Sequence, residues 1–144
     1  MKKRIIYTTL TLLWMFAIFL MSAQTAEVSG TESTVITVKI LGIFIKNPSP
    51  ALIDNIETLI RKLCHFSEYA ILCILLYKTL CSYGIKGKKV YLCVFIAFLY
   101  ALSDEIHQYF VPGRACRFYD IIIDTAGSYF GYLIVRKFKG NNSQ

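Results

Sequence analysis

The chain has 144 residues, of which 56% are hydrophobic and 17% are charged, and its formal net charge is +7. This length fits one domain, and a composition so apolar excludes an ordinary soluble domain and indicates a membrane protein with several spanning helices. The surplus Lys and Arg residues flank apolar runs, as orientation signals do. Because no basic stripe interleaved with aromatic residues appears, we expect no nucleic-acid partner.

The first apolar run covers residues 5–23, contains no charged residue and follows Lys2-Lys3-Arg4. It is long enough to span a bilayer. A cleaved signal peptide shows the same order of charge, apolar run and small residues, but three further membrane-length runs follow here. We therefore expect residues 5–23 to remain as the first of four transmembrane helices.

The longest connection follows this run. Residues 24–34 are polar and are expected to form a loop. Residues 35–46 are mostly apolar and too short to span a bilayer, and Lys39, Gly42 and Lys46 share one helical face. This pattern favours an interfacial or re-entrant helix. The frequent Val, Ile and Thr residues leave a strand open as the alternative.

A long helix is predicted to begin at Ser49 and Pro50, with the serine as its cap and the proline as its first residue. Its early turns are amphipathic, and Glu57 and Arg61 are spaced to pair as i and i+4. Its membrane part covers about residues 63–81.

Two more apolar runs, about residues 90–109 and 119–138, complete the four predicted transmembrane helices. With the N-terminus inside, the inner side of this arrangement carries ten cations and no acid. The outer side carries six cations, all nine acids and both histidines. We therefore expect a multi-pass protein with both termini in the cytoplasm.

Carboxylates recur at one level near the outer ends of the last three predicted helices. At about 1.5 Å per residue, Glu68, Asp104 and Asp124 each lie roughly 7–9 Å below the outer boundary. The acidic face of the last helix continues inward as Gly127 and Gly131, a small-residue face that favours close helix packing. The acids are therefore expected to point into the bundle, where ionisable groups are costly and mark a functional site by default.

We interpret this cluster as a binding or catalytic site. Its cations can hold phosphate or carboxylate groups, and a histidine beside a carboxylate suits general acid–base chemistry. The catalytic candidates are His65, Glu68, Asp104, Glu105 and His107. The substrate-binding candidates are Arg61, Lys62, Gln108, Arg114, Arg117, Asp120 and Asp124.

Other interpretations stay open. The acids and cations nearly neutralise one another, so the cluster could be an ion-pair network that only holds helices together. His65 with Glu68, and Asp104 with His107, are also i,i+3 pairs able to ligate a divalent metal, although the sequence requires no cofactor. The five cysteines form no Cys-x-x-Cys pair and are expected to be small packing residues.

Short motifs recur over nearly the whole length of the chain. They are Trp14 with Ser22-Ala23-Gln24, Arg61-Lys62-x-x-His65-x-x-x-Tyr69, Asp104-Glu105-x-His107-Gln108-x-Phe110, Pro112-Gly113-Arg114, and Asp120-x-x-x-Asp124-x-x-Gly127-x-x-x-Gly131. Together these motifs resemble those of the VanZ-like membrane proteins. Position 124 departs from the family pattern, because Asn is more usual there than Asp.

The resemblance implies an integral protein of a bacterial plasma membrane, linked in the family's named member to resistance to teicoplanin-type lipoglycopeptides. It supplies no biochemical mechanism. Three functions therefore remain as hypotheses. The pocket binds a lipid head group or a lipid-linked cell-wall intermediate, or it is an enzyme site acting on an envelope lipid, or the chain is a structural or interaction subunit.

Overall fold

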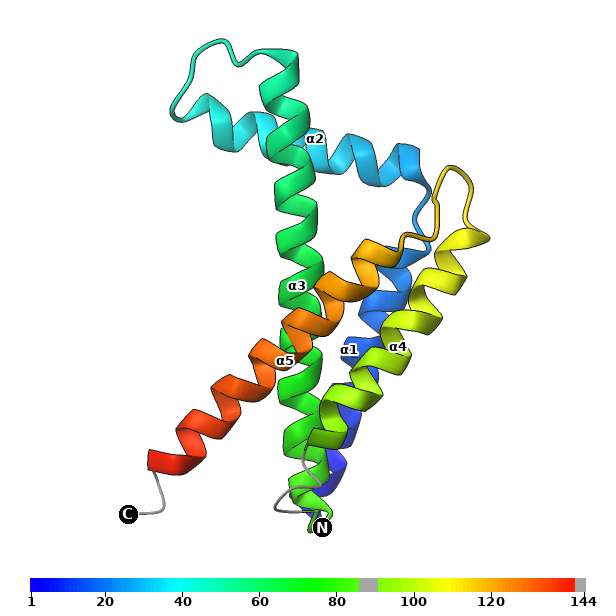
Figure 1. Cartoon of the computed structure of the whole chain (residues 1–144), viewed down its shortest axis with the longest axis vertical. Coiled ribbons are helices and arrows are strands. Elements are labelled where there is room, and N and C mark those ends of the chain that lie inside the picture. The colour runs from blue at the N-terminus through cyan, green and yellow to red at the C-terminus, as the bar shows by residue number, and fades with distance from the viewer. Residues whose placement is uncertain (86–90, 142–144) are drawn as a thin grey trace.

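The computed structural model describes residues 1–85 and 91–141, and within them every regular element is an α-helix (Figure 1). The all-α prediction is therefore confirmed for this part of the chain. The predicted start of the third membrane helix, residue 90, lies outside the described residues. The helices are α1 Lys2–Ser22, α2 Ala26–Gly42, α3 Pro50–Ser82, α4 Leu92–Tyr109 and α5 Phe118–Asn141.

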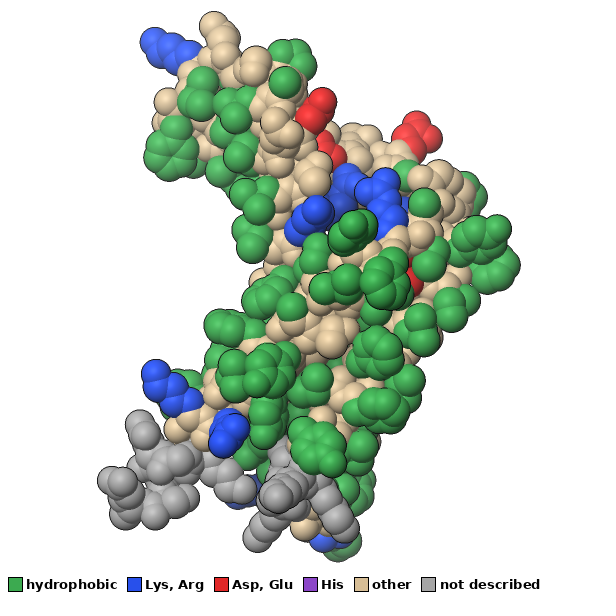
Figure 2. Space-filling view, in the orientation of Figure 1, with side chains coloured by type: hydrophobic (Ala, Val, Ile, Leu, Met, Phe, Trp, Pro, Cys, Tyr) green, Lys and Arg blue, Asp and Glu red, His purple; other side chains and the backbone are tan. Residues whose placement is uncertain are grey.

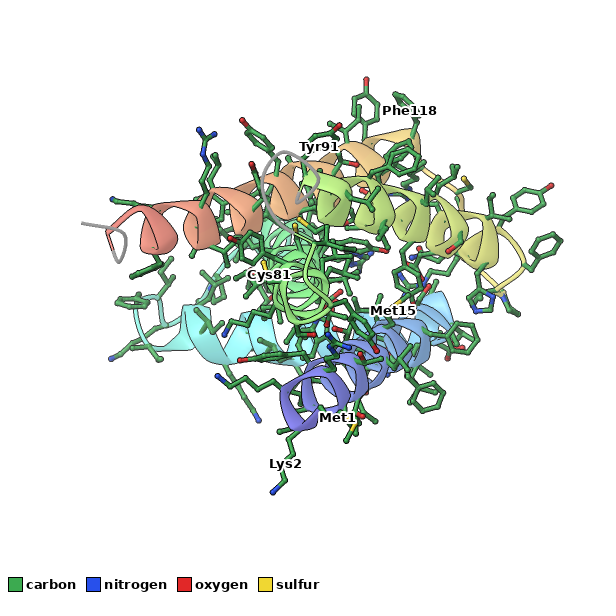
Figure 3. The ribbon with its side chains drawn as sticks, turned by 90° about the horizontal axis from the view of Figure 1, so that it is seen from below. Met1, Lys2, Met15, Cys81, Tyr91 and Phe118 are labelled. Atoms are coloured by element: carbon green, nitrogen blue, oxygen red, sulfur yellow. The ribbon has the colours of Figure 1, made fainter. Side chains whose placement is uncertain are left out.

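The long helix α3 is the centre of the molecule, and each of the other helices contacts it. Figure 3 shows α4 and α5 on one side of α3 and α1 on the other. Helix α5 crosses α3 obliquely, and α2 runs across the upper part of α3 (Figure 1). The start of α1 and the end of α5 both lie at the lower end of the molecule, away from α2 (Figure 1).

The prediction of a loop over residues 24–34 was wrong, because α2 already begins at Ala26. The side-chain oxygen of Thr25 accepts a hydrogen bond from the backbone N–H of Val28 at 3.4 Å and so caps the helix. Glu27 stands in the first turn, where a negative charge stabilises the helix dipole. Residues 35–42 of the predicted short helix are therefore part of a longer one that ends at Gly42, before the predicted end at residue 46, and the strand alternative is excluded.

The predicted start of α3 is confirmed. Ser49 accepts a hydrogen bond from the N–H of Leu52 at 3.3 Å, and Pro50 is the first helical residue. Glu57 and Arg61 pair one turn apart, with 3.0 Å between carboxylate and guanidinium. The helix continues without a break to Ser82, so α3 connects the level of α2 to the end where the termini lie.

Helices α3 and α5 pack backbone to backbone at Gly127 and Gly131. A Cβ atom at Gly127 would collide with the carbonyl oxygen of Phe66, and one at Gly131 with the carbonyl oxygen of Ala70. The close packing predicted for these two glycines is therefore confirmed.

The bundle interior below the crossing is built from small and aromatic residues, among them Tyr69, Cys73, Cys93 and Ala97, all fully buried. The five cysteines are free, and the sulfur atoms of Cys73 and Cys93 lie 3.4 Å apart. The prediction that cysteines serve packing holds for this buried pair. Cys64 and Cys116 are exposed instead.

Among the residues that the structure describes, α1 is the one helix whose length and composition alone suffice to cross a membrane. Helices α3, α4 and α5 carry acidic residues, which lower their mean hydropathy. The arrangement of four transmembrane helices therefore stays a prediction, to which we return below.

Candidate functional site

Two adjoining cavities lie beneath α2, where α1, α3 and the α4–α5 loop meet it. The smaller, of about 100 Å³, is called the mouth, and the larger, of about 250 Å³, the chamber. The polar and charged residues lining the mouth are Ser29, Thr58, Arg61, Lys62, His65, Gln108, Arg114, Arg117 and Asp120. The chamber shares Ser29, Arg61, His65, Gln108 and Arg114 with the mouth and adds Ser22, Gln24, Glu32, Ser33, Cys64, Glu68 and Asp104 to its polar lining.

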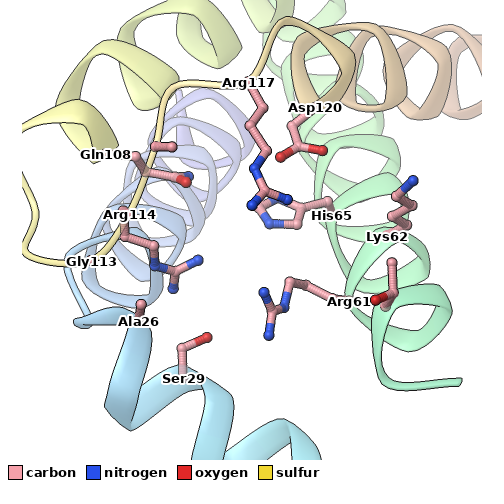
Figure 4. Close-up of a pocket in the computed structure, with 12 residues that line it drawn as sticks. Ala26, Ser29, Arg61, Lys62, His65, Gln108, Gly113, Arg114, Arg117 and Asp120 are labelled. Carbon is pink, nitrogen blue, oxygen red and sulfur yellow. The ribbon is translucent and has the colours of Figure 1, made fainter. Parts of the chain in front are cut away.

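Three guanidinium groups surround the mouth. Figure 4 shows Arg61 and Arg114 extending from opposite sides toward the same space, with Arg117 and His65 at its far side. Arg61 is paired with Glu57. Among the described residues, Lys62, Arg114 and Arg117 have no carboxylate within 4.0 Å. The mouth therefore holds positive charge that the protein itself does not neutralise.

The electrostatics of Arg114 agree with this surplus. Burial lowers the pKa of its guanidinium, and the nearby charge of Arg61 lowers it further, whereas the carboxylates of Asp104, Glu105 and Asp120 raise it. Burial and the charge of Arg61 disfavour the charged form of the side chain. A bound anion would favour that form, because it would place an opposite charge directly beside Arg114.

The turn that carries Arg114 is fixed against the start of α2. The N–H of Ala26 donates to the carbonyl oxygen of Pro112 at 3.3 Å. Gly113 has φ +75°, and a Cβ there would lie 2.9 Å from the Cβ of Ala26. Glycine is thus needed both for the backbone conformation and for the close approach. The Arg114 side chain then donates from Nε to the carbonyl oxygen of Gln24 at 3.2 Å.

The chamber combines carboxylates with apolar walls. Asp104 is buried and accepts a hydrogen bond from the side-chain nitrogen of Gln108 at 3.1 Å, and Glu68 faces it from α3. Ile18 and Ile36 contribute apolar surface from α1 and α2. The carboxylates can accept hydrogen bonds from hydroxyl, amide or amine groups of a ligand.

His65 lines both cavities, as Arg61 and Arg114 do, but its side chain does not carry a permanent charge as theirs do. Its Nδ1 lies 3.7 Å from Oδ1 of Asp124, whose side chain is fully buried. Within the described residues neither oxygen of that carboxylate has a hydrogen-bond partner. Asp124 therefore contacts His65 on the side away from the cavities and does not itself line either cavity.

Two predicted catalytic residues lie elsewhere. Glu105 is fully buried, and its Oε2 accepts a hydrogen bond from the backbone N–H of Arg117 at 2.7 Å, which fixes the end of the α4–α5 loop. The ring of His107 packs on Phe19 with 4.7 Å between ring centres, and His107 lines neither cavity.

The described residues include no group of three or more His, Cys, Asp and Glu side chains placed to hold a metal ion. The two predicted i,i+3 pairs do not converge, because His107 faces Phe19 while Asp104 faces the chamber.

Sequence reasoning missed the contribution of α2. Ser29, Glu32, Ser33 and Ile36 all line the cavities. Their spacing of three to four residues is that of one helical face, and this signal was present in the stretch that we expected to be a loop.

The fold and site define an all-helical protein with a charged pocket beneath a transverse helix, at the end of the bundle opposite the termini. The sequence model of the VanZ/LLP1 family matches residues 7–139, and the chain therefore belongs to the VanZ/LLP1 family. No curated protein and no solved structure matches the chain.

The residues that carried the family resemblance gather around the two cavities. Ser22, Gln24, Arg61, His65, Asp104, Gln108 and Arg114 all contribute to their lining. Trp14 anchors α1 beside them, because its indole N–H donates to the carbonyl oxygen of Glu68 at 2.9 Å. The motifs, dispersed in sequence, thus meet in one region of the fold.

Proposed function

We propose that the chain is an integral protein of a bacterial plasma membrane in which α1, α3, α4 and α5 span the bilayer and α2 lies at the outer surface. The distribution of side chains supports this. The acids Asp104, Glu105 and Asp124 are buried, whereas large apolar residues such as Leu13 and Phe95 are exposed. Figure 2 shows apolar side chains over most of the visible face, which suits contact with lipid rather than water.

The proposed orientation places both termini in the cytoplasm. The termini lie at the same end of the bundle, which an even number of spanning helices requires (Figure 1). The ten cations without an acid that the sequence assigns to this side favour the cytoplasm. The mouth and chamber would then face the outer leaflet.

The function that the site supports best is binding of an envelope lipid through its phosphate, either a lipid head group or a lipid-linked cell-wall intermediate. The carrying observation is the unneutralised positive charge of Arg114, Arg117 and Lys62 around the mouth. Guanidinium groups bind phosphate through paired, charge-assisted hydrogen bonds. The carboxylates of the chamber would hold hydroxyl or amide groups attached to that phosphate.

Binding of this kind offers a route to altered antibiotic sensitivity. A lipoglycopeptide meets its target at the outer leaflet, among lipid-linked intermediates. A protein that holds such an intermediate, or the lipid around it, would lower sensitivity to teicoplanin-type compounds. This role rests on membership of the family and on the position of the pocket, and it is part of the proposal.

Native mass spectrometry of the purified full chain tests the binding function. We expect polyprenyl phosphate to remain bound to the protein at lipid concentrations at which phosphatidylcholine is no longer bound. Arg114→Gln should reduce its retention more than tenfold. Lys46→Gln is the matched control, because Lys46 is exposed, carries the same charge and lines neither cavity. Equal loss in both variants, or no preference over phosphatidylcholine, would contradict the proposal and favour a structural subunit.

A second candidate function is hydrolysis of a lipid diphosphate, favoured by the contact between His65 and Asp124. His65 would take a proton from an attacking water, the new phosphorus–oxygen bond would form as the bridging bond breaks, and the products would be lipid phosphate and inorganic phosphate. Release of inorganic phosphate from a polyprenyl diphosphate, lost in His65→Gln, is the expected result. Binding without any release would leave the pocket as a binding site.

A further inference from the structure

A second basic site lies at the opposite end of the bundle, between the first turns of α1 and the last turns of α3. It is an open hollow of about 910 Å³. Figure 3 shows this end, with Met1 and Lys2 at the near end of α1 and Cys81 at the near end of α3. We call it the terminal hollow. Its charged and aromatic lining residues are Lys2, Lys3, Arg4, Tyr7, Tyr77 and Lys78.

Every charged side chain that lines the terminal hollow is positive. Among the described residues none of these cations lies within 4.0 Å of a carboxylate. A surplus of cations is also what a membrane-orientation signal requires, because such signals act through the number of cations flanking a membrane segment. The surplus alone therefore does not make the hollow a binding site, and the positions of the side chains must be considered.

Two of these cations are held in place. The guanidinium of Arg4 donates from Nε to the carbonyl oxygen of Ser82 at 2.9 Å and lies 5.4 Å from the ring centre of Tyr83. The ammonium of Lys78 lies 5.8 Å from the ring centre of Tyr7. Cation–π contacts of this kind fix a charge without neutralising it. Lys2, in contrast, extends away from the bundle (Figure 3).

The helices add to this potential. The first turn of α1 presents free backbone N–H groups and the positive end of the helix dipole. The carbonyl end of α3 is partly satisfied by Arg4, which reduces its repulsion of an anion. The hollow thus combines cations from two helices with aromatic rings that contact them.

We propose that the terminal hollow binds the phosphate of an anionic phospholipid in the inner leaflet, such as phosphatidylglycerol. Basic pockets between membrane helices on the cytoplasmic side bind such head groups. Tyr7 and Tyr77 suit the interface between head group and hydrocarbon, where aromatic rings concentrate. The proposal uses the membrane orientation given above but not the outer mouth, so it stands apart from the function of that pocket.

The test is lipid retention by the full chain, measured by native mass spectrometry against phosphatidylglycerol and phosphatidylcholine. We expect a preference for phosphatidylglycerol that Lys78→Gln reduces at least threefold and Lys78→Arg restores. Lys137→Gln is the matched control, because Lys137 is exposed near the end of α5, at the same end of the bundle, and does not line the hollow. Retention of polyprenyl phosphate should be unchanged in Lys78→Gln, which separates this site from the mouth.

Three results would overturn the proposal. Equal losses in Lys78→Gln and Lys137→Gln would mean diffuse attraction between lipid and positive charge. No loss in Lys78→Gln would mean that the hollow binds no lipid. Displacement of phosphatidylglycerol by an equal concentration of inorganic phosphate would mean a site for a soluble anion. Tyr7→Leu provides an independent check, because it removes the ring beside Lys78 without changing charge and should lower retention in the same direction.

Discussion

The imidazole of His65 stands between the two cavities and the buried carboxylate of Asp124, with 3.7 Å between Nδ1 and Oδ1. This contact joins α3 to α5 just above the glycine crossing, where Gly127 meets the carbonyl of Phe66. The position of His65 is therefore set by the closest helix packing in the site. The other histidine, His107, has no such support and packs on Phe19.

Alanine substitutions of the two histidines should therefore have different effects on ligand retention. His65→Ala should reduce retention of polyprenyl phosphate at least fivefold, because it removes a side chain that lines both cavities. His107→Ala, its matched control, should reduce retention by less than twofold. Lipid titration by native mass spectrometry measures both. A larger loss in His107→Ala would restore the role that the sequence predicts for His107 and would place the ligand outside the two cavities.

The glycine crossing itself should be sensitive to one added methyl group. Gly127→Ala would push against a backbone carbonyl that cannot rotate away, and overpacking of this kind costs about 1–3 kcal/mol of stability. Gly30→Ala is the control, because a Cβ at Gly30 meets no atom within 4 Å. Thermal unfolding in detergent should show a lower midpoint for Gly127→Ala and an equal or higher one for Gly30→Ala. An unchanged midpoint for Gly127→Ala would mean that α3 and α5 can separate freely.

The sequence predicted α3 and its cap, the glycine crossing and every charged residue of the cavity lining except Glu32, because these depend on local signals and on helical spacing. The sequence-based prediction failed where it had to identify which face of a helix points into the bundle. On α4, the buried residues Ala97, Ala101, Asp104, Glu105 and Gln108 define the inward direction. His107 leaves that face by about a third of a turn, given 3.6 residues per turn. The spacing of His107 from Asp104 in the sequence suggested that both side chains belong to one site. The packing of α4 against α1 shows instead that His107 contacts α1.

Helix α2 shows the other limit. Its first half lacks the apolar periodicity of an amphipathic helix, so residues 24–34 resembled a loop. Three hydrogen bonds made only in the folded chain hold it over the site. Ser33 and Thr34 donate to Glu57 at 2.7 Å each, and the N–H of Ala26 donates to Pro112. Such tertiary contacts override weak local preference and are not visible in the sequence.

These contacts predict a pH-dependent docking of α2. Hydrogen bonds from Ser33 and Thr34 lower the pKa of Glu57 below its usual value, and the charge of Arg61 lowers it further. A lowered pKa in the folded state means that the ionised carboxylate contributes stability at neutral pH. That contribution is lost as the pH falls from the ordinary glutamate range through the lowered pKa.

Hydrogen exchange of the α2 backbone, corrected for the intrinsic dependence of amide exchange on pH, should therefore stay slow at mildly acidic pH and accelerate only in stronger acid. Glu57→Gln should accelerate it at neutral pH and remove most of the pH dependence. Asp54→Asn is the control, since Asp54 is exposed one turn earlier on α3. Identical exchange in wild type and Glu57→Gln would show that α2 is held without this carboxylate.

The membrane arrangement is open to a direct test. Reporter fusions at Gly84 and at the C-terminus should read as cytoplasmic, and fusions at Gly30 and Ala115 as external. This expectation rests on the sequence, which assigns ten cations and no acid to the inner side and all nine acids to the outer side. Gly30 and Gly84 suit insertion because no atom lies within 4 Å of a Cβ built there. An external reading at the C-terminus would exclude four spanning helices with this orientation.

Arg114 gives the sharpest test of the proposed phosphate site, because its side chain makes two contacts at once. Its Nε donates to the carbonyl oxygen of Gln24, and the rest of its guanidinium faces the mouth opposite Arg61 (Figure 4). Lysine keeps the charge but not the planar fork, so it cannot hold Gln24 and a phosphate together. Loss of a charge-assisted hydrogen bond worth about 1.5–3 kcal/mol corresponds to a loss of tenfold or more in affinity.

We therefore expect Arg114→Lys to bind polyprenyl phosphate at least tenfold more weakly, with an unfolding midpoint close to that of the wild type. Arg136→Lys is the matched control, because Arg136 is exposed on α5 and lines neither cavity. That variant should lose less than threefold. If lysine at position 114 binds as well as arginine, the side chain acts only as a loose surface charge, and the phosphate is held elsewhere in the pocket.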